Sequence, residues 1–341
     1  MARIILVWTT VCLLGVGGFI KWYGACVERS NLFSTPTGES EVVWITVNVN
    51  DDPQQGDAHL LMAREGLTGG PGEVVLIDGG EYVKAKELLL PFLKTYGIEK
   101  INSIFITHPH NDHFGGAIAL LEAGFPIGEI YWNEPTKDVC ASEPWGCDPE
   151  AIEDLKTKAI HAEVPLKKLI EFDRGLLGRW GTLTSVFQAT GCPVERCSIN
   201  DTSWVSELRV GKTRALFTGD LDSAVGNWFA KNREGALKST FLKVPHHGTA
   251  GLPGVDFFSK VNPAIAIVPA HHPLWCNEKS QPTREWLLAN GDIKTYVNGV
   301  HGHIFVHFYR NGDYWVRTQY AEKRKLHCGP MSWADRVAIL R

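Results

Sequence analysis

One short stretch of the chain reads Thr107-His108-Pro109-His110-Asn111-Asp112-His113-Phe114-Gly115-Gly116. It follows an apolar run over 101–107 that is predicted to be a strand, and it leads into a predicted helix over 114–124. Three histidines and one aspartate within six residues cannot all face a core without leaving polar atoms unsatisfied. Bound metal ions are the simplest partner, because zinc, manganese and iron accept imidazole and carboxylate ligands.

The spacing inside this cluster predicts two metal ions. In an extended loop, alternate positions turn His108 and His110 to one side, while Asp112 and His113 at the start of a helix face an adjacent point. That arrangement suits two ions that share a bridging water. The sequence does not choose among zinc, manganese and iron.

The flanking segments predict a layered α/β fold. Working outward, apolar runs predict strands over 41–50, 59–64 and 74–77, then a helix over 85–96. Later strands are expected within 204–217, 241–244, 264–269 and 301–308, and polar residues follow several of them. Strand, polar loop and helix thus recur in two halves, which is typical of a sandwich with functional groups at strand ends.

Five motifs in this order resemble the metallo-β-lactamase fold superfamily, and within it the hydrolase domain of ComEC-type competence DNA-uptake proteins. The resemblance covers residues 41–308 and implies a four-layer αββα sandwich that acts as a metal-dependent hydrolase. In such proteins the domain sits beside a many-helix channel, whereas this chain has one apolar segment, so we expect no DNA channel in it. Besides the histidine cluster, the motifs are Gln55-Gly56-Asp57-Ala58, Val75-Leu76-Ile77-Asp78-Gly79-Gly80, Leu216-Phe217-Thr218-Gly219-Asp220-Leu221 and Leu242-Lys243-Val244-Pro245-His246-His247-Gly248-Thr249.

The resemblance also implies the ligands of two divalent metal ions, zinc or manganese. His108 and His110 would hold the first ion, and Asp112 and His113 the second. Bridging and catalytic roles fall to Asp220, with Asp112 as the other catalytic residue. The last ligand is expected to be His246, with His247 beside it as a substrate-binding or outer residue, and Asp78 is expected to hydrogen-bond a ligand histidine.

One ligand of the first metal departs from the family pattern. Many members place a further histidine between the cluster and the bridging aspartate, whereas this chain has Ser198-Ile199-Asn200-Asp201-Thr202-Ser203 there. We expect Asp201 to contact the first metal or its water, which predicts a weaker first site that favours manganese. Whether His271 or His303 lines this site stays open.

The leading functional hypothesis is hydrolysis of phosphodiester bonds, in nucleic acid or a surface polymer, by a metal-bound hydroxide. Alternatives are a hydrolase of lactone, thioester or β-lactam bonds, and a membrane-anchored accessory protein without activity. With 34 Lys and Arg against 38 Asp and Glu, the net charge of −4 gives no overall attraction to a polyanion. DNA or another phosphodiester polymer would therefore be held locally.

The N-terminus predicts export from the cytoplasm. Ile4 to Ile20 is uncharged, so residues 1–25 are predicted to be a membrane anchor or a cleaved signal, followed by a linker over 26–40. The hydrolase domain is predicted over 41–320, in a membrane-anchored or secreted protein with this domain outside the cytoplasm, and residues 321–341 as a tail. One or two disulfides are expected, with free thiols or a zinc knuckle as alternatives, among Cys140, Cys147, Cys192 and Cys197.

Overall fold

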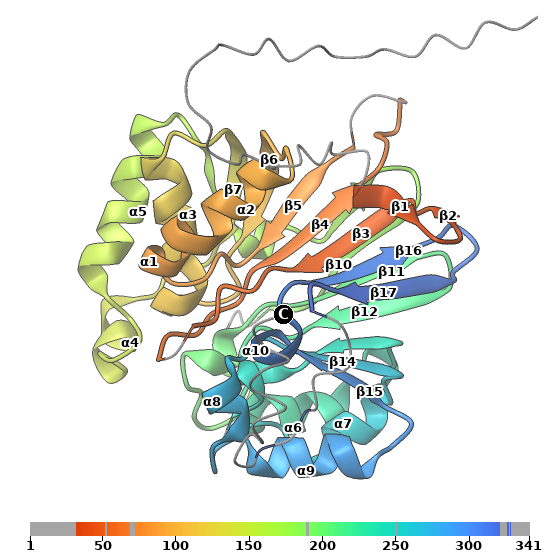
Figure 1. The fold of residues 1–341 in the computed structure, drawn as a ribbon. Helices are drawn as coiled ribbons and strands as arrows, with labels where there is room; N and C mark the ends of the chain where they lie inside the picture. The colour runs from red at the N-terminus through yellow and green to blue at the C-terminus, as the bar shows by residue number, and fades with distance from the viewer. Residues whose placement is uncertain are drawn as a thin grey trace, which may run out of the picture.

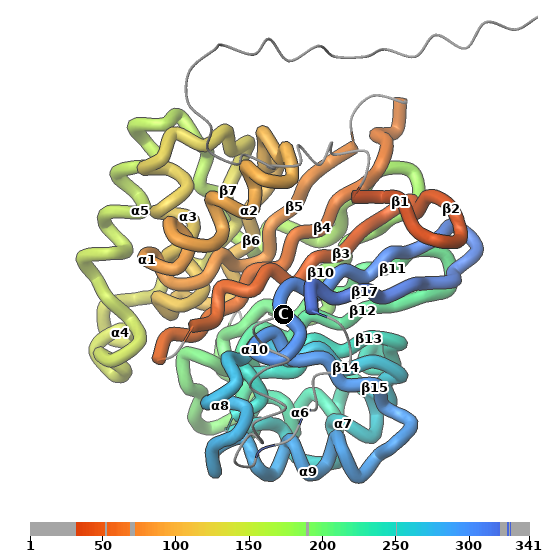
Figure 2. The backbone as a smooth tube through the Cα atoms, in the orientation of Figure 1, coloured from red at the N-terminus to blue at the C-terminus, as the bar shows by residue number. Residues whose placement is uncertain are grey.

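The computed structural model describes residues 32–51, 53–68, 72–188, 191–249, 251–320, 326 and 328. Two large β-sheets are stacked in the middle, and helices cover the outer face of each sheet (Figure 1). The predicted four-layer αββα sandwich is therefore confirmed. The chain closes on itself, since the late strand β16 (Ile304–Phe308) pairs with the early strand β3 (Val42–Thr46), as the tube in Figure 2 shows.

The first sheet has eight strands in the order β17-β16-β3-β4-β5-β6-β7-β8. Its remaining strands are β4 (His59–Ala63), β5 (Val74–Ile77), β6 (Ile101–Phe105), β7 (Ile127–Trp132), β8 (Leu166–Lys168) and β17 (Tyr314–Thr318). The helices in this half are α1 (Tyr82–Lys84), the π-helical turn η2 (Ala85–Leu89), α2 (Leu90–Thr95), α3 (Asn111–Glu122), α4 (Lys137–Ser142) and α5 (Pro149–His161).

The second sheet has seven strands in the order β15-β14-β13-β12-β11-β10-β9. They are β9 (Arg174–Leu177), β10 (Gly181–Phe187), β11 (Val205–Val210), β12 (Thr213–Phe217), β13 (Phe241–Lys243), β14 (Ile265–Val268) and β15 (Lys294–Val297). The helices in this half are α6 (Ser223–Asn232), α7 (Val255–Val261), α8 (His272–Cys276), α9 (Gln281–Ala289) and α10 (Asn298–His301). Short 3₁₀ turns are η3 (Leu169–Glu171), η4 (Asn200–Thr202), η5 (Glu234–Ala236) and η6 (Pro245–Gly248).

The strands separate the core into layers because successive side chains point to opposite faces. In β3, Val43 and Ile45 pack toward the helices of the first half, whereas Val42 and Trp44 lie between the sheets. The Trp44 ring meets Phe217 of β12 edge-on, with 4.6 Å between the ring centroids. The central strands are buried on both faces, which explains why they appear in the sequence as continuous apolar runs.

Predicted boundaries differ from the structure near both ends of the predicted domain. Residues 32–40, predicted as part of the linker, form a hairpin of β1 (Ser34–Thr35) and β2 (Gly38–Glu39), and Leu32 and Phe33 are buried. The strand predicted over 301–308 starts only at residue 304. His301 is the last residue of α10, and Gly302 after it has a φ of 68°, which is incompatible with a strand.

The predicted N-terminal anchor or signal, residues 1–25, lies outside the described residues, as does most of the predicted tail. Among the helices that the structure describes, none is long and apolar enough to cross a membrane. Disulfides join Cys140 to Cys147 and Cys192 to Cys197, so the disulfide prediction is confirmed. A third disulfide, which the sequence did not predict, joins Cys276 at the end of α8 to Cys328.

The loop after β5 and the start of α3 are in direct backbone contact. Gly79 N–H donates to the carbonyl of His113 at 2.8 Å, and Gly116 N–H donates to the carbonyl of Gly80 at 2.8 Å. A Cβ atom on Gly116 would lie 2.1 Å from the Gly79 oxygen. Only glycine therefore allows this approach, which fixes the place of the histidine cluster relative to the sheet.

We expect Gly116→Ala to destabilise the fold. The added methyl group forces the loop and helix apart, and such overpacking costs about 1–3 kcal/mol, which exceeds the helix propensity gained. Gly235→Ala is the control, because nothing lies within 4 Å of a Cβ there. Urea denaturation gives the free energy of unfolding of each variant, and equal values for the two variants would contradict the assigned contact.

Candidate metal centre

Polar groups gather at one edge of the sandwich because parallel strands end there together. Strands β5 and β6 are parallel, and so are β12 and β13. Asp78 follows β5, the histidine cluster follows β6, Asp220 follows β12, and the His246-His247 pair follows β13. The two halves of the sandwich thus each contribute side chains to one centre.

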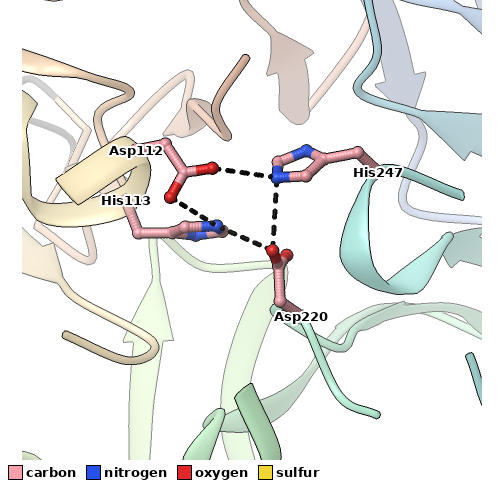
Figure 3. Close-up of side chains that lie close together, drawn as sticks. All are labelled: Asp112, His113, Asp220 and His247. Carbon is pink, nitrogen blue, oxygen red and sulfur yellow. Dashed lines mark hydrogen bonds and ion pairs between the residues drawn. The ribbon is translucent and has the colours of Figure 1, made fainter. Parts of the chain in front are cut away.

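Four of these side chains form a compact group (Figure 3). Asp112, His113, Asp220 and His247 each offer one nitrogen or oxygen atom, and these atoms all lie within 4.8 Å of one another. Asp220 Oδ2 lies 3.1 Å from His113 Nε2 and 3.2 Å from His247 Nε2. Apart from this ion-pair contact with Asp220, the buried His113 Nε2 has no hydrogen-bond partner among the described residues. Two imidazoles and two carboxylates around one point fit a divalent transition-metal ion.

His108 and His110 offer a second pair of nitrogen donors beside this group. His108 Nε2 lies 3.2 Å from His110 Nδ1, so both atoms face one point. The rings of His108 and His113 are neighbours, with 4.1 Å between their centroids. These two nitrogens would hold the first metal ion next to the second.

Asp78 makes the contact expected of it. Its Oδ2 accepts a hydrogen bond from His113 Nδ1–H at 2.8 Å, and its carboxylate also accepts from the backbone N–H and the hydroxyl of Thr107. Because this bond keeps a proton at Nδ1, the Nε2 atom of His113 would offer its lone pair to a metal ion once that ion displaces the second proton.

His247 and His108 also keep a proton on Nδ1, because each Nδ1–H group has a hydrogen-bond acceptor. His247 Nδ1–H donates to the carbonyl of Pro269 at 2.9 Å. His108 Nδ1 lies 3.0 Å from the hydroxyl oxygen of Thr107, which accepts because its own proton is donated to Asp78. Both Nε2 atoms therefore face the centre unprotonated when a metal binds.

Asp57 and Lys243 belong to the site although the sequence analysis gave them no role. Lys243 is 1 % exposed, and its ammonium contacts the carboxylate of Asp57, donates to the Gly219 carbonyl at 2.6 Å and reaches Asp220 Oδ1 at 3.3 Å. Asp57 Oδ1 in turn lies 3.3 Å from His247 Nδ1. A lysine inside the apolar segment 241–244 was the available signal, since lysine is almost never buried unpaired.

The charges in the centre are strongly coupled. Burial raises the pKa of Asp220, but His113 and His247 lower it, and the net pKa is well below the usual range. Burial lowers the pKa of His113, but Asp220 and Asp78 raise it well above its ordinary value. The imidazoles thus carry the positive charge that the carboxylates require, and a dication would displace those protons and take over that charge.

The histidine pair after β13 is arranged opposite to expectation. His247 is fully buried in the centre, whereas His246 is turned to its rim, with a side chain 24 % exposed and Nδ1 3.1 Å from Asp222 Oδ1. Both residues have left-handed backbones, with φ of 46° and 52°, and this turn swings the second histidine inward. The ligand position predicted for His246 is therefore corrected to His247.

Asp201 does not face the centre as predicted. Its Oδ1 accepts from the backbone N–H of Val225 at 3.1 Å, in the first turn of α6, and its Oδ2 accepts from the N–H and hydroxyl of Ser198. A carboxylate satisfies the unpaired N–H groups at a helix start, and this competes with metal binding.

His271 and His303 are also used elsewhere. His271 Nδ1 accepts from the backbone N–H of Leu274 at the start of α8, and His303 Nδ1 accepts from the N–H of Asn48. Neither belongs to the group of ligating atoms found among the described residues. In this structure, therefore, neither His271 nor His303 supplies a ligand atom to the group.

Comparison with known proteins agrees with this architecture. The sequence model of the metallo-beta-lactamase superfamily matches residues 66–137. Similar proteins include ComE operon protein 3 of Bacillus subtilis (strain 168), 26 % identical over 264 residues, and competence protein ComA of Neisseria gonorrhoeae, 25 % identical over 223 residues. These matches cover 73 % and 64 % of this chain but 31 % and 27 % of the relatives, so the chain spans about a third of their length.

The solved structures that match the chain have low sequence identity to it. The metallo-beta-lactamase fold protein YhfI from Bacillus subtilis is 11 % identical with a TM-score of 0.44, over 80 % of this chain and 99 % of that one. A diphosphatase from the PhnP family is 16 % identical with a TM-score of 0.44, over 81 % of this chain and 97 % of that one.

The two histidines after β13 should differ in their effect on metal binding. His247→Ala removes a ligand, so we expect its zinc affinity to fall by more than about 100-fold, since loss of an outer partner alone costs 10–100-fold. His246→Ala should bind nearly as tightly as the unchanged chain. Competition titration with a zinc indicator measures both, and a larger loss in His246→Ala would reverse the assignment.

The half-buried His303 should make the stability of the fold depend on pH. Burial lowers its pKa from 6.5 to about 4, so between these values the unfolded chain binds more protons than the folded one. The neutral His303 side chain therefore makes its full contribution to the free energy of unfolding above pH 6.5, and this contribution is lost as the pH falls toward 4. His303→Gln should therefore lose less unfolding free energy than the unchanged chain between about pH 7 and about pH 5. If His303→Gln and the unchanged chain lose the same unfolding free energy over this range, the prediction is wrong. The control is His161→Gln, at an exposed residue, which should lose as much as the unchanged chain.

Proposed function

We propose that this chain, as a metal-dependent hydrolase with the metallo-β-lactamase fold, hydrolyses phosphodiester bonds with two divalent metal ions, zinc or manganese. The substrate would be nucleic acid or another phosphodiester polymer of the cell surface. The observation that carries the proposal is the group formed by Asp112, His113, Asp220 and His247, with His108 and His110 beside it.

Different residues would hold each of the two metal ions. His108 and His110 would hold the first ion, while Asp112, His113 and His247 would hold the second. Asp220, whose Oδ2 lies 3.1 Å from His113 Nε2 and 3.2 Å from His247 Nε2, would bridge both ions. When bound, the ions supply Lewis acidity and a water of lowered pKa, so no serine or cysteine nucleophile is needed.

The charges of the centre suit an anionic substrate. Lys243 balances Asp57, and the other carboxylates of the centre belong to Asp78, Asp112, Asp220 and, beside His110, Glu143. Two dications would match these four carboxylates, so a phosphodiester would be held by direct contact of its oxygen atoms with the ions. A phosphodiester oxygen carries negative charge and would gain more from that contact than the carbonyl oxygen of a lactone, thioester or β-lactam. The similarity to two competence proteins also supports a nucleic-acid substrate.

The proposed compartment is outside the cytoplasm, in a membrane-anchored or secreted protein. Three disulfides among the described residues support this, because such bonds persist in oxidising compartments. The uncharged segment from Ile4 to Ile20 would serve as the anchor or signal.

Activity assays on three different substrates test the proposal. We expect the full chain, loaded with manganese or zinc, to cleave bis-(p-nitrophenyl) phosphate and single-stranded DNA, and to leave nitrocefin intact. Asp112→Ala should lower kcat by about 100-fold or more, because it removes a metal ligand, whereas Asp138→Asn on the exposed start of α4 should not. Cleavage of nitrocefin without cleavage of either phosphodiester would favour the alternative hydrolase.

A further inference from the structure

One ligand histidine lacks the outer partner that the others have. The distal nitrogens of His108, His113 and His247 are held by Thr107, Asp78 and Pro269, as described above. His110 presents Nδ1 to the first metal position, so its Nε2 carries the proton and points away. This Nε2 atom is buried and has no hydrogen-bond partner among the described residues.

The side chain of His110 faces a small loop closed by a disulfide. Cys140 and Cys147 are both buried in the core of the first half, so the loop is attached at both ends. The N–H of Asn111 donates to the Gly146 carbonyl at 3.2 Å, which ties the loop to the start of α3. A Cβ atom on Gly146 would lie 2.6 Å from His110 Nε2, so the loop backbone rests directly on the imidazole ring.

Glu143 in this loop is the group placed to receive the proton. Its Oε2 lies 3.5 Å from His110 Nε2, and its side chain is 15 % exposed. Its Oε1 accepts the backbone N–H of Ile199 at 2.9 Å, which fixes the carboxylate. Ile199 belongs to the segment 198–203, which stands where many relatives place a further histidine ligand.

We propose that Glu143 is a positioning residue of the metal centre. When the first metal binds Nδ1 of His110, the Nε2–H group closes its short gap to Glu143 and donates a hydrogen bond to the carboxylate. The bond fixes the tautomer and makes the imidazole a stronger ligand, as carboxylate partners do at metal-bound histidines. The disulfide loop thus gives the first site the support that Asp78 gives the second. The inference rests on the proposed two-metal centre.

Glu143→Gln isolates this role. The amide oxygen of glutamine can still accept from Ile199 N–H, so the loop keeps its anchor, but its NH₂ group then faces His110 Nε2. That contact favours a proton on Nδ1, which is the nitrogen the metal requires. A purely structural role for Glu143 would therefore leave metal affinity unchanged, whereas the positioning role would not.

The test titrates the full chain, stripped of metal, with manganese or zinc alone. We expect the unchanged chain to bind two ions and Glu143→Gln to bind one of them about 10–100-fold more weakly. Glu143→Asp should recover part of the affinity, and Glu150→Gln, on an exposed residue of α5, should match the unchanged chain. The d–d absorption of bound cobalt should change in Glu143→Gln at the weaker ion only.

Two results would overturn the inference in different ways. Two ions bound with unchanged affinity by Glu143→Gln would remove the role of Glu143 and leave the proposed function intact. An unchanged chain that binds no ion would overturn the two-metal centre and this inference together. If Glu143→Gln lowers the melting temperature, an equal loss of affinity in a comparably destabilised Gly128→Ala chain, where the added Cβ would lie 2.4 Å from the Asn102 oxygen at the start of β7, would also contradict a specific role.

Discussion

The buried ammonium of Lys243 lies between two aspartates that belong to different parts of the chain. Asp57 lies just before β4 of the first sheet, and Asp220 follows β12 of the second. Lys243 therefore links the two halves of the sandwich through ion pairs. Burial lowers the pKa of Lys243, but Asp57 and Asp220 raise it above its ordinary value. Breaking such a buried pair on one side typically costs about 3–5 kcal/mol, because a charge is left uncompensated.

The rest of the centre follows from the same need for charge compensation. One lysine cannot balance the carboxylates of Asp57, Asp78, Asp112 and Asp220, so further positive charge must be present at this edge. His113 and His247 supply it as imidazolium groups, or dications supply it in their place. Uncompensated carboxylates at this edge would raise the free energy of the fold, and the same negative charge attracts cations to the site. The hydrogen bonds from the distal histidine nitrogens then direct the ligand atoms to one place.

The sequence was sufficient for the features that depend on local pattern. The cluster after β6 predicted a metal site because six consecutive positions determine which side chains lie near one another. Alternation and apolar runs predicted most of the strands. The role of Asp78 came from the resemblance to the family, and the structure shows the expected hydrogen bond between Asp78 and His113.

Other features depend on contacts that no local pattern contains. Whether His246 or His247 turns inward is decided by the left-handed backbones of these two residues, a conformation that is uncommon for residues other than glycine. Asp201 caps α6, an element 22 residues further along the chain, and Glu143 reaches His110 only because a disulfide folds its loop over the ring. Lys243 was overlooked because its two partners are distant in sequence and its own strand is apolar.

Anomalous scattering from crystals grown with manganese or zinc would test the account most directly, because it places each ion without reference to activity. We predict one peak enclosed by Asp112, His113, Asp220 and His247, and a second between His108 and His110 on the other side of Asp220. A single peak held by His246 and Asp222, or the absence of any peak within this group of residues, would contradict the assigned centre.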